Sequence, residues 1–336
     1  MQKIIIALLL LAALLVVGGY GYWKNSQPIP MDYLVASGGV PELLSKIIKY
    51  YEIDKENGLD INFISANPGD IERREFSGEV EGVLVMSPFT AVKSTIDGRP
   101  MKILFPVTNM TYYMAVRANS PVKSLEDLVG KKVAMLSKAT VTYNSVAMIL
   151  KSAGIDPDKD LLTTYATIPE MIELLKNGQV EAATVNYPGA ANLFASGQFR
   201  SIATLEDIWE NNENGVPHPF VVNAAFEDWY AKQSNKKIAE RFAATFFEVI
   251  ARARQNPNLL TEESNPLVKE YLEQNKLTSE PAKKLVRENV LTFLPSGWTK
   301  KESDSILYVL KAAQVAGYLP RTINVEEAVA PAPNQE

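Results

Sequence analysis

Two short polar loops are the first candidates for a ligand-binding site. One is Ser37-Gly38-Gly39, and the other, one hundred residues later, is Ser137-Lys138-Ala139-Thr140. Each loop follows a short apolar run and precedes a segment with helical periodicity. The first N–H groups of a helix have no partner within the helix, so they attract anions and polar groups. We therefore expect ligand contacts from Ser37, Gly38, Gly39, Ser137, Lys138 and Thr140.

Purely structural roles compete with ligand contact at these positions. Ser37-Gly38-Gly39 has the composition of an ordinary glycine-rich turn. Ser137 and Thr140 are also good N-cap residues, and a cap satisfies a helix N–H group without any ligand. Lys138 could pair with an anionic head group or extend into solvent.

Two further loops carry aromatic and amide side chains. Ser87-Pro88-Phe89 and Asn186-Tyr187-Pro188 each follow an apolar run that predicts a buried strand. The rings of Phe89 and Tyr187 could enclose a flat or apolar ligand, with core packing as the competing role. We add Ser87, Phe89, Asn186 and Tyr187 to the candidate ligand-binding residues.

These four loops belong to an internal repeat with an offset of 100 residues. Residues 78–88 align with residues 178–188, and five of the eleven positions are identical. Upstream of each segment the pattern predicts strand, helix, strand, helix and strand, with strands at residues 32–36, 59–64 and 80–85 and at 132–136, 162–166 and 180–185. Parallel strands with crossover helices form open α/β sheets, which bind ligands beyond the carboxyl ends of their strands. The repeat therefore predicts an α/β protein of two lobes, each a mostly parallel, doubly wound sheet.

The remaining segments predict how the two lobes are connected. An apolar run at residues 102–107 indicates another strand, residues 112–117 indicate a strand leaving the first lobe, and residues 220–224 indicate a strand returning to it. Two crossings would form a hinge, and Asn109 and His218 lie beside them. We include both in the candidate ligand set, with plain loop roles as the alternative. Helices are expected at residues 238–254, 267–274, 282–290 and 302–316.

The expected domain division follows from this order. Lobe 1 comprises residues 31–117 and 219–330 with the C-terminal helices, and lobe 2 comprises residues 118–218. Residues 331–336, with two prolines and a terminal glutamate, are expected to be a disordered tail.

Residues 4–22 carry no charged side chain. A helix of this length spans about 28 Å, close to the ~30 Å hydrocarbon core of a bilayer. Aromatic residues at its far end favour a membrane interface. We assign residues 1–24 to an uncleaved anchor or a cleaved signal sequence and residues 25–30 to a linker. The absence of an Ala-x-Ala site and the length of the apolar run favour the anchor, and both alternatives place the rest of the chain outside the cytoplasm, in the periplasm or at the cell surface.

Composition excludes several functional classes. The 336 residues include no cysteine and a single histidine, which excludes disulfides, thiolate metal sites, a cysteine nucleophile and a lipidated cysteine anchor. The net charge of −5 argues against a nucleic-acid partner. Nucleophile-elbow, Walker and zinc-protease motifs are absent from the sequence. We expect no catalytic residues, no metal and no cofactor.

Several motifs resemble those of one known family. Residues 120–133, Ser-Pro-Val-Lys-Ser-Leu-Glu-Asp-Leu-Val-Gly-Lys-Lys-Val, resemble the lobe-entry motif of the nitrate/sulfonate/taurine/thiamin-pyrimidine class of ABC substrate-binding proteins. Residues 57–61, Asn-Gly-Leu-Asp-Ile, resemble the family's Glu-Gly-Leu-Asp-Val, and residues 78–81 and 178–181 resemble its paired Gly-x-(Val/Ile)-Asp elements. Asn186-Tyr187-Pro188 stands where members often show Trp-Glu-Pro. The similarity extends from about residue 32 to residue 224.

The resemblance implies a type II periplasmic-binding-protein fold that closes its lobes around a small ligand. It also implies delivery of that ligand to the transmembrane permease subunits of an ABC importer, by a protein that we expect to be monomeric. The ligand would be a small organic molecule or oxyanion, such as a sulfonate, nitrate or a pyrimidine. A supply of aromatic residues favours a ligand with a ring or an apolar part over nitrate: Phe89, Tyr112, Tyr113, Tyr143, Tyr187 and Phe220.

Two other functions remain as alternatives. One is a membrane-tethered sensor or scaffold domain of the same fold. The other is an enzyme similar to the thiamin-pyrimidine synthases related to this family. Those enzymes depend on a cysteine-rich motif and iron-binding histidines, which this chain lacks.

Overall fold

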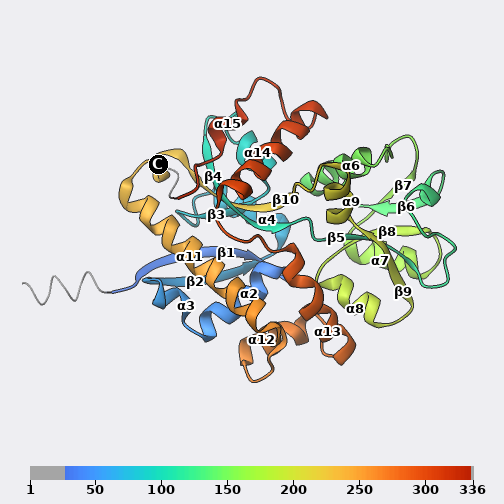
Figure 1. Ribbon diagram of the computed structural model, residues 1–336, viewed down its shortest axis with the longest axis horizontal. Helices are drawn as coiled ribbons and strands as arrows, with labels where there is room; N and C mark the ends of the chain where they lie inside the picture. Colours follow the sequence, from blue (N-terminus) through green and yellow to red (C-terminus); the bar gives the residue numbers. More distant parts are fainter. Residues whose placement is uncertain (1–26, 334–336) are drawn as a thin grey trace, which may run out of the picture.

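The structure is a computed structural model that describes residues 27–333. Two lobes lie side by side along the longest axis of the molecule (Figure 1). The predicted anchor at residues 4–22 lies outside the described residues. Within residues 27–333, no helix combines the length and apolar character that a membrane span requires.

The first lobe contains a parallel strand pair and a three-stranded sheet whose strand order differs from the order along the chain. Strand β1 (Ile29–Ala36) pairs in parallel with β2 (Leu59–Ala66), from Ile29 opposite Leu59 to Ala36 opposite Ala66. The second sheet has the order β3-β10-β4, built from β3 (Leu84–Met86), β10 (Pro219–Phe226) and β4 (Met101–Asn109). The strand predicted to return from the second lobe is therefore confirmed. It runs antiparallel to both neighbours, so β3 pairs with β10 and not with the parallel pair.

The second lobe is one five-stranded sheet in the order β7-β6-β8-β5-β9. Strands β6 (Lys132–Met135), β7 (Leu162–Tyr165) and β8 (Ala182–Asn186) are parallel, as the repeat predicts. Strand β5 (Tyr112–Arg117) pairs antiparallel with β8, and the edge strand β9 (Phe199–Thr204) pairs antiparallel with β5. Residues 112–117, which the sequence assigned to lobe 1, thus pair within the sheet of lobe 2. The first crossing lies just before them, between Asn109 and Tyr112.

Helices cover both lobes and position the loops at the strand ends. In α2 (Val40–Tyr50), Pro41 occupies the first turn, where a missing N–H has no cost, and the apolar face at Leu43, Leu44 and Ile47 is fully buried. The other helices of the repeat are α4 (Pro68–Phe76), α6 (Val141–Ser152) and α7 (Ile168–Lys176). The shorter helices and 3₁₀ turns are α3 (Ile53–Glu56), α5 (Pro88–Lys93), η1 (Glu126–Leu128), α8 (Gly189–Ala195), α9 (Leu205–Asn212), α10 (Glu227–Tyr230), η2 (Pro257–Thr261), η3 (Val290–Phe293) and α15 (Val325–Ala328).

The four predicted C-terminal helices are present. They are α11 (Gln233–Gln255), α12 (Pro266–Gln274), α13 (Glu280–Asn289) and α14 (Lys300–Val315). The long helix α11 crosses the first lobe (Figure 1) and buries Phe242 and Phe246. Helix α13 packs against α8 of the second lobe, and the ring of Phe293 lies 5.7 Å from that of Tyr187. The lobes therefore touch through this helical region as well as through the two crossings.

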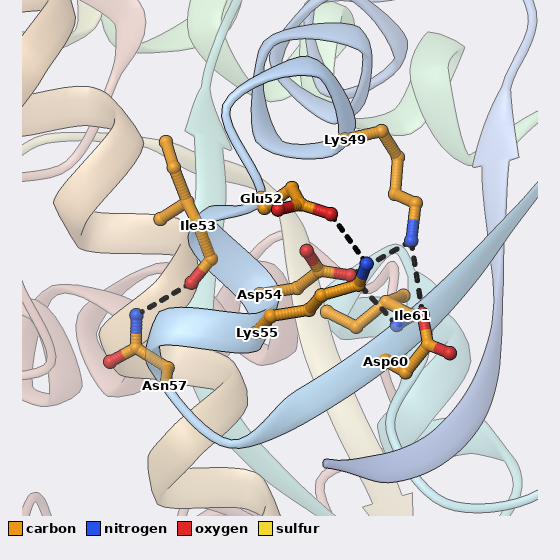
Figure 2. Close-up of polar contacts among 8 residues, drawn as sticks. All are labelled: Lys49, Glu52, Ile53, Asp54, Lys55, Asn57, Asp60 and Ile61. Carbon is orange, nitrogen blue, oxygen red and sulfur yellow. Dashed lines mark hydrogen bonds and ion pairs between the residues drawn. The ribbon is translucent and has the colours of Figure 1, made fainter.

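A buried carboxylate fixes the start of β2. Asp54 on α3 is fully buried and accepts hydrogen bonds from the backbone N–H of Ile61 at 2.9 Å and from Lys49 Nζ at 3.0 Å. Lys49 also reaches the exposed carboxylate of Asp60 at 3.2 Å (Figure 2). Because a buried charge is costly unless it is paired, this network joins α2, α3 and β2 in one arrangement.

The chain after α15 packs against the first lobe. The backbone N–H of Ala330 donates to the carbonyl of Ile103 on β4 at 2.8 Å, and Ala332 is buried. Residues 331–333 therefore do not form the expected disordered tail, because the side chain of Ala332, between the two prolines, is buried. Residues 334–336 lie outside the described residues.

Candidate functional site

A cavity of about 240 Å³ lies between the two lobes. Its walls come from the end of β1 and the start of α2, from α4, from the end of β3, from the end of β8 and from the start of α6. Both crossings border it, through Thr108 and Thr111 on one and Phe220 and Val221 on the other. This is the position expected for a ligand site at the carboxyl ends of strands in two facing lobes.

Five of the residues proposed from the sequence line this cavity: Ser37, Gly39, Ser87, Asn186 and Tyr187. Ser37 Oγ donates to the carbonyl of Ala66 at 2.7 Å, which joins the ends of the paired strands β1 and β2. Ser87 caps α5 by accepting the N–H of Phe89 at 3.2 Å. These hydroxyl groups fix the loops, so the cavity wall is held by hydrogen bonds within lobe 1.

Gly38 does not line the cavity, although its neighbours in the loop do. Its N–H donates to Glu42 Oε2 at 2.7 Å, and its carbonyl accepts the hydroxyl of Tyr271 at 3.1 Å. Gly38 has φ +73°, a conformation that favours glycine, and this turn directs its peptide groups into the protein. The glycine thus shapes the loop, and Gly39 is the residue that borders the cavity.

The matching loop of the second lobe is placed differently. Ser137 and Lys138 are exposed, and Thr140 is half-buried outside the cavity lining. Thr140 Oγ1 caps α6 by accepting the N–H of Tyr143 at 3.1 Å, while Lys138 Nζ pairs with Asp158 at 2.7 Å. Thr140 therefore makes the contacts of a helix N-cap, which was the alternative to ligand contact at this position. The cavity is reached instead by Val141 and Thr142, in the first turn of the helix.

The aromatic side chains that line the cavity, called the aromatic wall below, are not the expected pair of Phe89 and Tyr187. Phe89 is fully buried in the core of lobe 1 and does not line the cavity. Tyr187 does, together with Tyr112 and Phe220, whose ring centroids lie 5.7 Å apart in an edge-on arrangement. Burial raises the pKa of Tyr112 to about 12, so its phenol is neutral and serves as a hydrogen-bonding group. Flat apolar surface is therefore supplied by the crossings and by lobe 2.

Asn109 and His218 lie near the crossings but away from the cavity. Asn109 borders a separate cavity of about 150 Å³ beside Pro217 and Arg254. His218 is fully buried, and its ring stands edge-on to Trp209 at 5.0 Å. Burial lowers the pKa of His218 to about 4, which keeps the ring neutral. Its role in the described structure is packing at the hinge.

Four polar residues of the cavity were missed by the sequence-based reasoning: Glu72, Thr108, Thr111 and Thr142. Glu72 lies on α4, and its Oε1 accepts a hydrogen bond from Thr90 Oγ1 at 2.8 Å. Thr108 Oγ1 is buried and has no hydrogen-bond partner within residues 27–333. A usable signal existed for Glu72, because α4 begins at the carboxyl end of β2, and its first turns must face the same edge as the other loops.

No cluster of three or more histidine, aspartate or glutamate side chains that would hold a metal occurs within residues 27–333. The polar groups of the cavity are hydroxyl, amide and carboxylate oxygens from separate elements. The arrangement is suited to reversible binding of a small molecule that combines an apolar part with a few hydrogen-bonding groups.

Comparison with known proteins gives a family and a fold. Residues 77–246 match the model of the family described as "ABC transporter, phosphonate, periplasmic substrate-binding protein". A search of curated proteins found no match.

Solved structures share the architecture at low sequence identity. The periplasmic aliphatic sulphonate-binding protein SsuA from Escherichia coli superposes with a TM-score of 0.66 at 16% identity, covering 92% of this chain and 94% of that one. The alkanesulfonate-binding protein SsuA from Xanthomonas axonopodis pv. citri, bound to MOPS, gives 0.64 at 16% identity, with coverage of 91% and 99%. A Candida albicans protein described as having the generic periplasmic binding protein fold gives 0.58 at 13% identity, with coverage of 91% and 96%. The predicted two-lobed periplasmic-binding fold is confirmed.

Proposed function

We propose that this protein captures a small organic solute between its two lobes and passes it to the permease. The chain belongs to the phosphonate periplasmic substrate-binding family of ABC transporters. The family is one of transport binding proteins, and the chain is a solute-binding protein of an ABC importer. The proposal adds the place and the nature of the ligand.

The cavity between the lobes is the observation that supports this proposal most. It is bordered by the strand ends of both lobes and by both crossings, so a bound molecule would contact the two halves at once. A ligand with that placement stabilises the closed arrangement, because it gains contacts that the separated lobes cannot give. The volume of about 240 Å³ lies below the roughly 300–1,000 Å³ of pockets for drug-sized ligands, which favours a small solute.

Native mass spectrometry of the freshly purified full chain in detergent tests this proposal. We expect a small molecule of defined mass to be bound at one copy per chain and to be released unchanged on denaturation. A chemically altered product would support the enzyme alternative. Absence of any bound molecule, together with no stabilisation by a panel of small metabolites, would favour the scaffold alternative.

We further propose that residues 4–22 hold the mature protein at the outer face of the membrane. The support is the length of the uncharged stretch and the aromatic residues at its end. N-terminal sequencing of the mature protein tests it. An intact N-terminus agrees with an anchor, whereas a mature chain that begins after residue 19 or 23 shows a cleaved signal sequence.

A further inference from the structure

The charges around the cavity between the lobes are unlike those that an anionic ligand requires. Among the described residues that line it there is no lysine, arginine or histidine, and the only charged side chain is Glu72. The two arginines that follow on the same helix are engaged elsewhere, Arg73 with Asp70 and Arg74 with Glu79. A sulfonate or phosphonate in this cavity would lie near the Glu72 carboxylate with no cation to compensate the two negative charges. Their repulsion, and the cost of removing both from water, oppose binding.

A buried acidic side chain lies in the first turn of α2, beside the loop that precedes the helix. Glu42, only 3% exposed, accepts the N–H of Gly38 at 2.7 Å and the hydroxyl of Ser65. A negative group at a helix N-terminus is favourable, and here the protein supplies that group itself. The loop of lobe 1 that precedes α2 therefore already has an acidic side chain beside it, bonded to the N–H of Gly38.

At the start of α6 the side chain of Thr140 caps one of the helix N–H groups. Thr140 Oγ1 accepts the N–H of Tyr143 at 3.1 Å and donates its own proton to the carbonyl of Ser137 at 2.7 Å. The lysine of this loop pairs with Asp158 and does not reach the cavity. Neither helix N-terminus at the cavity thus presents a charged donor toward the ligand.

The cavity instead presents one carboxylate, several hydroxyl groups and aromatic surface. Glu72 has no ion-pair partner within residues 27–333, and its recorded hydrogen bond from Thr90 uses one of its two oxygens. The buried Thr108 Oγ1, 2% exposed, lines the cavity without a hydrogen-bond partner within the same residues. The rings of Tyr112 and Phe220 stand beside them. A carboxylate acceptor next to aromatic faces is the combination that binds a nitrogen cation or an N–H donor on a flat molecule.

We infer that the cavity binds a small organic molecule that carries an amine or amino-heterocycle nitrogen beside a flat apolar part, and that Glu72 is the residue that selects it over sulfonates and phosphonates. This inference rests on the proposed function, since it assigns the ligand class of the same cavity. The amino group would donate to Glu72, and the ring would lie against the aromatic wall. This ligand class differs from the phosphonate that the family description names.

Calorimetry with the full chain in detergent, after removal of any bound molecule, tests the inference. Four probes are titrated: 4-aminopyrimidine and benzylamine as donors, and ethanesulfonate and methylphosphonate as anions. We expect at least one donor to bind ten times more tightly than either anion. Glu72→Gln should weaken the binding of that donor about tenfold, because the amide oxygen of glutamine can still accept a hydrogen bond but carries no charge. The matched control is Glu173→Gln on α7, an exposed glutamate paired with Lys176 that should leave affinity unchanged.

The outcomes separate this inference from the proposed function. Tighter binding of ethanesulfonate or methylphosphonate overturns the inference and leaves the transport role intact. An unchanged donor affinity in Glu72→Gln, with folding shown by circular dichroism, also overturns it. Binding of none of the four probes overturns the ligand class, and if no molecule is released from the purified protein either, the proposed function itself is contradicted.

Discussion

One oxygen of the buried Glu206 carboxyl group accepts a hydrogen bond from the backbone N–H of His218 at 3.0 Å. Its other oxygen accepts the N–H of Met110 at 3.1 Å. Met110 lies on the first crossing and His218 at the end of the second, so one side chain of α9 joins the two connections between the lobes. Glu206 is 5% exposed. These two bonds hold the backbones of the two crossings at a fixed separation.

Replacing Glu206 should destabilise the protein. Glu206→Ala leaves two buried N–H groups without an acceptor, which we expect to lower the free energy of unfolding by about 2–4 kcal/mol. Glu206→Gln keeps the shape and one acceptor, so its loss should be smaller. Urea unfolding followed by circular dichroism measures both, with Glu210→Gln on the same helix as the control. An alanine variant within 0.5 kcal/mol of the parent protein would show that the crossings do not depend on this carboxylate.

Two buried carboxyl groups should make stability fall as pH rises. Burial raises the pKa of Glu206 and of Glu75 from 4.5 to about 8 in the folded protein. Their stabilising effect is complete below pH 4.5 and is lost toward pH 8, because only the unfolded state releases protons in that interval. His218 acts oppositely, since burial lowers its pKa to about 4, and its contribution is lost as pH falls from about 6.5 to 4.

Between pH 6.5 and 8, therefore, only the carboxyl effect remains from these groups. We expect the free energy of unfolding to fall by about 1.4 kcal/mol per pH unit for each carboxyl that stays protonated. Denaturant titrations at a series of pH values measure this slope, and Glu75→Gln should reduce it. A stability that is constant or rises between pH 6.5 and 8 would contradict the expected protonation of both groups.

The network around Asp54 predicts an asymmetric effect of two neighbouring aspartates. Asp54→Ala removes the buried partner of the Ile61 N–H and of Lys49, and should cost about 2–3 kcal/mol of unfolding free energy. Asp60→Ala removes an exposed partner of the same lysine and should cost less than about 1 kcal/mol. Thermal or urea unfolding compares the two variants. Equal losses would mean that burial at Asp54 does not govern the network.

Gly39 and Thr140 provide a pair of variants that separates the cavity from the helix cap. A Cβ at Gly39 would lie 3.1 Å from the carbonyl of Ala36, and a valine there would also narrow the cavity. We expect Gly39→Val to weaken ligand binding at least tenfold. Thr140→Ala should lower stability by about 1 kcal/mol, the usual cost of losing a cap, and should change affinity less than twofold.

Calorimetry with the co-purified ligand measures both affinities, and the exposed Lys284→Ala serves as the control. A Gly39→Val variant that binds as tightly as the parent would remove the loop of lobe 1 from the site. A large affinity loss in Thr140→Ala would return the loop of lobe 2 to it.

The order of elements could be predicted from the sequence because the two repeat copies share periodicity and turn residues. The pairing of the strands could not, since β10 begins at residue 219, far along the chain from the end of β3 at residue 86, and inserts between β3 and β4. Residues 112–117 illustrate the same limit: an apolar run shows a strand but not which sheet it joins.

The candidate site was predicted in part for a similar reason. Ser37, Gly39, Ser87, Asn186 and Tyr187 line the cavity because strand ends determine their position. Side-chain direction decided the rest. Phe89 turns into the core, Gly38 is held by Glu42, and Lys138 is held by Asp158. None of these contacts has a periodic signal in the sequence.

A ligand bound between the lobes should close them. A distance measurement across the cavity tests this closure most directly. The chain contains no cysteine, so Asn67→Cys at the start of α4 and Ser137→Cys before α6 can carry two spin labels without other labelling. Electron double resonance then gives the distance between lobes in the full chain, with and without the small molecule released from the purified protein. We predict a shorter and narrower distance distribution with the ligand, and a return to the longer distance when it is removed. The same distribution in both states, at a ligand concentration that saturates binding, would contradict the account.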